Sequence, residues 1–326
     1  MNSSPLWSSL KQSTKNQLLA SANRFLGKKG YTIVSDQSTR VPDGFYDGMR
    51  HHIACAGTEI LSIVFSKDRA MQLHAFIGSY FDNIANHSPL IVLYTCSTPH
   101  HHASYKQLLS LFSDKPVVFV EEIDFRLQLI AILSSTPASR ILFYVDDMIF
   151  THRFDYSVLK TVNPYTCIVA LSRGEDLTYS TVLVRDLALP SFTPTTGGLV
   201  TFKWNELQEH SDWTFPLGLS GFMYAKAEIL CMLEHISFKA PNSLEAAMHV
   251  FRPFFINRSG LCTKNAVAVC IHANLTQTEF SNQTIGTFTT LELLERWNSG
   301  QRIDYKEYYN IPMHVAQVKA YTFSPS

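Results

Sequence analysis

The chain has 326 residues, enough for one large α/β domain or for two smaller domains. Its 27 Lys and Arg balance its 27 Asp and Glu, and this neutral charge argues against a nucleic-acid partner held by a basic surface. Apolar residues make up 46% of the chain and charged residues 17%, which excludes disorder over most of its length.

No stretch of the sequence has the length and apolar character of a membrane span. The longest apolar runs, 129–133 and 266–271, are well below the ~18 residues that a spanning helix needs. The N-terminus lacks the apolar core of a secretory signal. Six cysteines without a CxxC pair are typical of reduced thiols in a cytosolic protein. We therefore expect a cytoplasmic location.

The first 35 residues form a basic segment. They contain five Lys and Arg and no Asp or Glu, and apolar residues repeat at helical spacing before Gly30. This pattern predicts an amphipathic helix that either packs on the protein or lies peripherally on an anionic membrane surface, at the inner face of a membrane. The polar stretch 36–58 has the composition of a linker, so 1–58 is interpreted as an N-terminal helix and linker.

From residue 60 onward, short apolar runs alternate with segments of helical periodicity. Four apolar runs have the length of a β-strand and are predicted strands: 60–65, 90–95, 117–120 and 141–145. Helical spacing is seen at 73–84, 105–112 and 129–133. The alternation predicts an α/β fold with a mostly parallel sheet flanked by helices.

Two adjacent acids, Asp146 and Asp147, follow the fourth predicted strand. Ligands bind at the carboxyl ends of the strands in parallel sheets. Neighbouring carboxylates repel each other and lose solvation there, and a cation shared with a ligand phosphate would offset both costs. No Gly-rich phosphate loop follows any predicted strand. The pattern therefore favours a divalent metal that links the protein to a diphosphate.

The segments FSKDRAMQL (65–73), FYVDDMIF (143–150) and PNSLE (241–245) resemble those of sugar-nucleotide-dependent glycosyltransferases of the GT-A fold, in the broad family 2-like group. The resemblance covers roughly residues 60–305. The chain departs from a strict DxD motif because Met148 stands at its third position. Which of the two acids contacts the metal is therefore open.

The resemblance implies that the half at 59–150 binds the nucleotide sugar. The residues that would do so stand at or after the predicted strand ends: Phe65, Ser66, Lys67, Arg69, Glu121 and Asp146. Asp146 and Asp147 would bind Mn²⁺ or Mg²⁺. His272 is either a third metal ligand or a strand-end histidine that binds no metal.

The half at 151–326 would belong to the same catalytic domain and bind the acceptor. Glu245 stands early in a predicted helix and would take the proton of the acceptor hydroxyl, as an inverting transfer requires. The alternative is that Glu245 caps its helix by pairing back to Asn242 or Ser243.

The implied activity is metal-dependent transfer of a sugar from a nucleotide diphosphate sugar to a glycan or a lipid-linked acceptor, as in surface polysaccharide synthesis. Two other functions remain open. A nucleotidyltransferase of sugar phosphates usually has a Gly-rich basic loop after the first strand, and FSKDRA contains no glycine. The other is a non-catalytic member of the fold that binds a glycan or a partner. Ser220 favours this function, because the resemblance implies an acid at that position.

Overall fold

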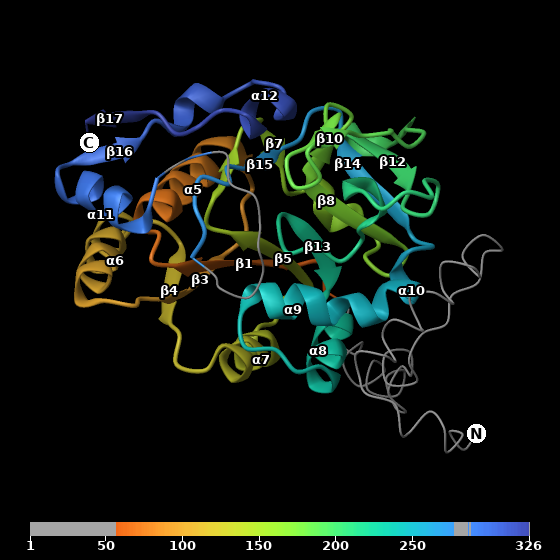
Figure 1. Ribbon diagram of the computed structural model, residues 1–326. Coiled ribbons are helices and arrows are strands. Elements are labelled where there is room, and N and C mark those ends of the chain that lie inside the picture. Colours follow the sequence, from red (N-terminus) through yellow and green to blue (C-terminus); the bar gives the residue numbers. More distant parts are fainter. Residues whose placement is uncertain (1–56, 277–285, 287, 326) are drawn as a thin grey trace, which may run out of the picture. The chain divides into compact units, whose positions relative to one another are not determined.

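The computed structural model describes residues 57–276, 286 and 288–325 (Figure 1). The predicted N-terminal basic helix, and the linker as far as residue 56, lie outside these described residues. No helix of the described part is long and apolar enough to cross a membrane.

A nine-stranded sheet forms the centre of the described chain, with the strand order β11-β12-β14-β8-β13-β5-β1-β3-β4. All strands of this sheet run in one direction except β12 and β13. The predicted mostly parallel α/β sheet is therefore confirmed. The strands are β1 (Ile60–Lys67), β3 (Leu90–Thr95), β4 (Val117–Glu121), β5 (Arg140–Val145), β8 (Cys167–Gly174), β11 (Thr193–Pro194), β12 (Leu199–Lys203), β13 (Phe222–Ala225) and β14 (Ser259–Thr263).

Helices cover both faces of the sheet (Figure 1). The chain steps from β1 outward to β3 and β4, and then returns to β5 on the other side of β1. Because such crossovers are right-handed, this reversal places α5 (Ala70–Asn83) and α6 (Pro99–Leu111) on one face and α7 (Phe125–Ser135) on the other. α11 (Thr290–Asn298) packs on α5 and α6, and α8 (Lys226–His235) packs on α7.

Smaller elements surround these layers. Four two-stranded ribbons pair β2 (Ile84–Ala85) with β7 (Phe154–Asp155), β6 (Met148–Phe150) with β15 (Ala268–Cys270), β9 (Tyr179–Ser180) with β10 (Arg185–Asp186), and β16 (Gln301–Ile303) with β17 (Phe323–Pro325). The remaining helices are α9 (Pro241–Met248), α10 (Arg252–Phe255) and α12 (Met313–Gln317).

The centre of the sheet is held by β1 and β5, whose apolar side chains are buried on both faces. Phe65 of β1 stacks on Phe143 of β5, with ring centroids 5.7 Å apart. Burial on both faces explains why these strands read as continuous apolar runs and not as alternating patterns. β1 is also the strand at which the order of the sheet reverses, so a crevice forms between the carboxyl ends of β1 and β5.

Candidate active site

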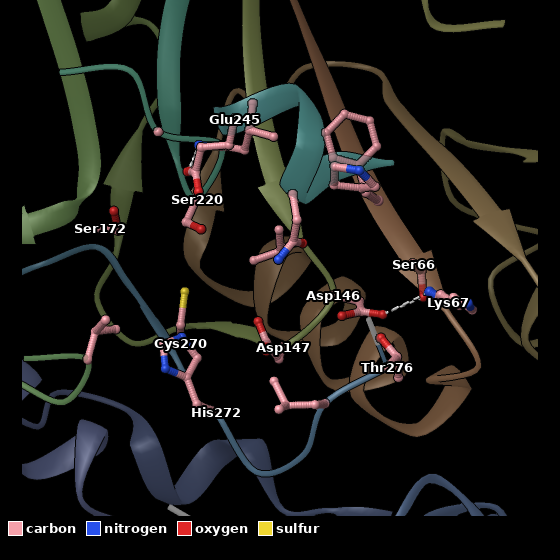
Figure 2. A pocket seen from close by; sticks show the side chains of 18 of the residues that line it. Ser66, Lys67, Asp146, Asp147, Ser172, Ser220, Glu245, Cys270, His272 and Thr276 are labelled. Atoms are coloured by element: carbon pink, nitrogen blue, oxygen red, sulfur yellow. Dashed lines mark hydrogen bonds between the residues drawn. The ribbon is translucent and has the colours of Figure 1, made fainter. Parts of the chain in front are cut away.

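A cavity of about 860 Å³ opens at the carboxyl ends of the parallel strands (Figure 2). Its volume lies in the range of sites for small molecules and cofactors. Most of the residues predicted for the site line this one cavity: Phe65, Ser66, Lys67, Arg69, Asp146, Asp147, Glu245 and His272. The fold therefore brings together side chains from positions 65 to 272 of the chain.

Asp146 is fixed across the crevice between β1 and β5. Its Oδ2 accepts hydrogen bonds from the Ser66 hydroxyl at 2.7 Å and from the Lys67 backbone N–H at 3.3 Å. The Ser66 hydroxyl is in turn hydrogen-bonded to the Tyr105 hydroxyl. Asp146 is only 3% exposed, and burial raises the pKa of its carboxyl, which the charge of Arg69 partly opposes.

Arg69 binds both acids at once. Its Nη1 lies 2.9 Å from Asp146 Oδ1 and 3.1 Å from Asp147 Oδ2, and its Nη2 donates to the Asn274 carbonyl oxygen. Burial would lower the pKa of this guanidinium, but the two carboxylates raise it above its ordinary value. We predicted that Arg69 would bind the nucleotide sugar. In the structure it contacts both acids, and its single positive charge offsets part of the mutual repulsion of the two carboxylates.

A divalent metal fits one part of this arrangement. Both carboxylate oxygens of Asp146 are engaged by protein donors. Asp147 has one carboxylate oxygen that accepts no hydrogen bond from the described residues, and His272 lines the same cavity (Figure 2). A carboxylate oxygen with an imidazole is a donor set that suits Mn²⁺, and the oxygen suits Mg²⁺.

Glu245 lies across the cavity from the acid pair, next to Ser220 (Figure 2). Its Oε1 accepts a hydrogen bond from the Leu219 backbone N–H at 3.0 Å. The start of α9 is capped by Ser243 instead, whose hydroxyl accepts from the Ala240 N–H at 3.0 Å. The capping alternative for Glu245 therefore does not describe this structure. Burial raises the pKa of Glu245, and the Leu219 hydrogen bond and the charge of Arg173 partly oppose that shift.

One predicted residue lies outside the cavity. Glu121 is exposed and pairs with His102, with 3.5 Å between Oε2 and Nε2, while its neighbour Glu122 lines the cavity. Side chains alternate between the two faces of a strand, and the sequence at the end of β4 does not show which acid faces the site.

The sequence pattern did not identify some of the other residues that line the cavity. Cys270 and Asn274 flank His272, and they reach the site because β15 pairs with β6, which places Cys270 opposite Met148. Gln317 comes from α12 near the end of the chain. Antiparallel pairing between segments more than 100 residues apart leaves no local pattern in the sequence, so these contributions were not predicted.

The fold and the site define an α/β protein with its polar residues at the switch point of a mostly parallel sheet. No protein-family model matches the chain. A curated relative is the "Bifunctional glycosyltransferase pgtA" of Dictyostelium discoideum, 26% identical over 180 residues, which are 50% of this chain and 23% of the relative. The chain thus spans less than a quarter of that relative's length. The match confirms the resemblance to glycosyltransferases.

Two solved structures match parts of this chain at low similarity. TarS of S. aureus in complex with UDP-GlcNAc gives a TM-score of 0.41 at 12% identity, over 69% of this chain and 60% of that chain. The mannosyltransferase PcManGT from Pyrobaculum calidifontis, in complex with GDP-Man and Mn²⁺, gives a TM-score of 0.28 at 10% identity, over 44% of this chain and 51% of that chain.

Proposed function

We propose that this chain transfers a sugar from a nucleotide diphosphate sugar to a glycan or lipid-linked acceptor, with Mn²⁺ or Mg²⁺ at the site. The observation that carries the proposal is the placement of Asp146 and Asp147 at the crevice between β1 and β5, with Glu245 across the same cavity. The similarity to a curated glycosyltransferase supports it.

The nucleotide would bind along the carboxyl ends of β1 and β5. Phe65, Ser66 and Asp146 form a buried, hydrogen-bonded edge there, and Lys67 is exposed at the cavity. Lys67 is free to meet phosphate oxygens because its side chain makes no ion pair with the described residues, whereas Arg69 is held by the acids. Glu122, which lines the cavity, would take the role that we predicted for Glu121.

Asp147 and His272 would hold the divalent cation, which when bound would stabilise the charge that develops on the departing diphosphate. Asp146 would position Asp147 and would not itself bind the cation, because both of its carboxylate oxygens accept hydrogen bonds from Ser66, Lys67 and Arg69. Arg69 balances one of the two negative charges of the acid pair, so one negative charge is left for the cation.

Glu245 would accept the proton of the acceptor hydroxyl as that oxygen attacks the anomeric carbon. A carboxylate whose pKa is raised is a stronger base than an ordinary glutamate. The hydrogen bond from the Leu219 N–H fixes the orientation of the carboxylate. The second oxygen of the carboxylate is then available to the acceptor.

A donor screen tests the proposal. The full chain is incubated with Mn²⁺ and a panel of UDP-, GDP- and dTDP-sugars. Water takes the place of the acceptor, so the sugar is hydrolysed off, and release of the nucleoside diphosphate is followed by ³¹P NMR. We expect release with one or a few donors that stops when EDTA is added. Glu206→Gln, an exposed acid outside the cavity, serves as the control for nonspecific effects of substitution. Release from no donor would contradict the proposed activity.

A further inference from the structure

The edge of the nine-stranded sheet at β4 is open and apolar (Figure 1). β4 ends the strand order, and among the described residues it pairs with β3 alone. Its residues 117–120 are Val-Val-Phe-Val, and Val118 is 58% exposed. The opposite edge strand, β11, is two residues long and contains Pro194. Short strands, charges and prolines protect sheet edges from pairing with other chains, so β4 lacks the protection that β11 has.

The hydrogen bonds between β4 and β3 show which backbone groups of β4 point outward. The Glu122 N–H donates to the Tyr94 carbonyl of β3 at 2.7 Å. Backbone groups alternate between the two sides of a strand, so the odd-numbered residues of β4 turn their N–H and C=O groups to the open edge. These residues are Val117, Phe119 and Glu121.

Two of these six outward groups are already occupied. The Val117 N–H donates to the Lys115 carbonyl at 2.7 Å, and the Glu121 carbonyl accepts from Gln128 Nε2 at 2.8 Å. The other four are both groups of Phe119, the Val117 carbonyl and the Glu121 N–H, and they form no hydrogen bond with the described part of the chain. Two donors and two acceptors are therefore open to another strand.

A second copy of β4 that runs antiparallel to the first matches these four groups. With Phe119 opposite Phe119 of the partner, the two residues exchange both of their N–H···O bonds, and each Glu121 N–H faces the Val117 carbonyl of the other copy. The Val117 N–H and the Glu121 carbonyl, which are occupied, are the groups that would face each other in this pairing. The open groups are thus complementary to themselves about a two-fold axis.

The side chains agree with the same pairing. It places Val118 opposite Val120 of the partner, at a closely spaced position of an antiparallel pair, so the exposed apolar surface of Val118 would be covered. It also brings the exposed side chain of Lys115 next to the exposed side chain of Glu121 of the partner, on one face of the sheet. Opposite charges on neighbouring strands stabilise their pairing.

We propose that the chain forms a two-fold dimer through antiparallel pairing of β4 about Phe119, which continues the sheet of one copy into that of the other. The dimer is independent of the proposed glycosyltransferase function, because it depends on β4 and not on a ligand in the cavity.

Sedimentation equilibrium of the full chain measures the association. The mass of the wild type should approach twice the 36.9 kDa of one chain as the concentration rises. Val118→Lys places a charge opposite the partner's valine and leaves the bonds to β3 in place, so it should weaken the dimer at least tenfold, about 1.4 kcal/mol. Val318→Lys, at a similarly exposed valine outside β4 and the cavity lining, should dimerise like wild type.

A charge exchange tests the antiparallel register without a change to the apolar strand. Lys115→Glu and Glu121→Lys should each weaken self-association, because each places like charges together at both ends of the pair. An equal mixture of the two variants should form a heterodimer, because each variant supplies the charge that the other lacks. Amide hydrogen exchange of residues 117–121 in the wild type should slow as the dimer forms.

Each remaining outcome speaks against the proposal. A wild type that stays monomeric at every concentration overturns it. A dimer that is left unchanged by Val118→Lys and by both charge reversals overturns it too, because another surface would then form the dimer. Weaker association of both charge variants without a heterodimer in their mixture overturns the antiparallel register about Phe119. None of these results affects the proposed function.

Discussion

Arg69 is the residue that makes an acid pair possible at the end of a buried strand. Asp146 and Asp147 are 3% and 8% exposed, and without a cation two such carboxylates would repel each other in a medium of low polarity. Arg69 Nη1 contacts both of them. The sequence showed an arginine just after the first predicted strand, but it did not show that its partners would be acids some 77 residues away.

Replacing Arg69 should therefore destabilise the protein. Arg69→Met leaves the buried carboxylates uncompensated, and loss of one partner of a buried pair typically costs about 3–5 kcal/mol. The cost should shrink as pH falls, because protonated carboxyls no longer need a counter-charge, and burial already raises the pKa of Asp146. Urea unfolding at pH 8 and pH 5 measures both effects. An equal cost at the two pH values would contradict the ion-pair explanation.

Glu245 should affect turnover more than donor binding. Glu245→Gln keeps the acceptor for the Leu219 N–H but removes the base, so the transfer rate should fall about 10²–10⁴-fold while nucleotide affinity stays near that of wild type. Wild-type turnover should rise with pH through the pKa of Glu245, which lies above its ordinary value of 4.5. The variant should lack this rise.

Steady-state kinetics from pH 4.5 to 8, with Glu206→Gln as the control, check this prediction. Turnover of Glu245→Gln within a few-fold of wild type would assign the base to another group.

At the scale of elements, local periodicity predicted the N-terminal half well. The apolar runs at 60–65 and 141–145 became β1 and β5, and the helical spacing at 73–84 became α5. These elements can be predicted because each one has its own repeat of apolar residues in the sequence. They place Ser66 and Asp146 at neighbouring strand ends, where the two side chains are hydrogen-bonded. That these residues bind a nucleotide sugar stays a prediction.

The cavity residues near β15 and α12 are placed by strand pairing and helix packing that leave no pattern in the sequence. β15 reaches β6 across more than 100 residues, and α12 adds Gln317 from near the C-terminus. A strand of three residues has no measurable periodicity, and its register is set by its partner. His272 was named as a candidate metal ligand because it follows an apolar run. Asn274, two residues later, was not named as a site residue.

The packing of β12 on β14 gives a test of the second half of the sheet. Gly260 of β14 stands opposite Phe202, and a Cβ on Gly260 would lie only 2.2 Å from that ring. The ring has no room to move, since it packs on Trp204 and Trp213 with centroids 4.6 and 5.0 Å away. Gly260→Ala should destabilise the protein by about 1–3 kcal/mol through overpacking.

Denaturant unfolding measures this cost, with Gly57→Ala as the control, where the nearest atom to the added Cβ is 3.7 Å away. Gly260→Ala as stable as wild type would mean that the ring is not held as described. Both tryptophans beside it are fully buried, which agrees with a role in the core.

At the scale of the whole molecule, the location of the chain is a prediction from residues 1–30 alone. Five basic residues should attract the chain to anionic lipid by about 1 kcal/mol each when they lie near the surface, and added salt should weaken the attraction. Co-sedimentation with phosphatidylserine vesicles should detect binding that is lost on deletion of 1–30. Equal binding to neutral vesicles, or none to either, would contradict peripheral attachment.

Metal-dependent donor binding tests the central claim most directly. Calorimetric titration with the nucleotide sugar from the donor screen should show binding with Mn²⁺ that weakens at least tenfold, about 1.4 kcal/mol, in EDTA or in Asp147→Ala. Asp114→Ala, at an exposed acid that does not line the cavity, should bind like wild type. Equal affinity with Mn²⁺, with EDTA and in Asp147→Ala would show that the acid pair holds no metal, and no binding by wild type would refute a nucleotide-sugar site.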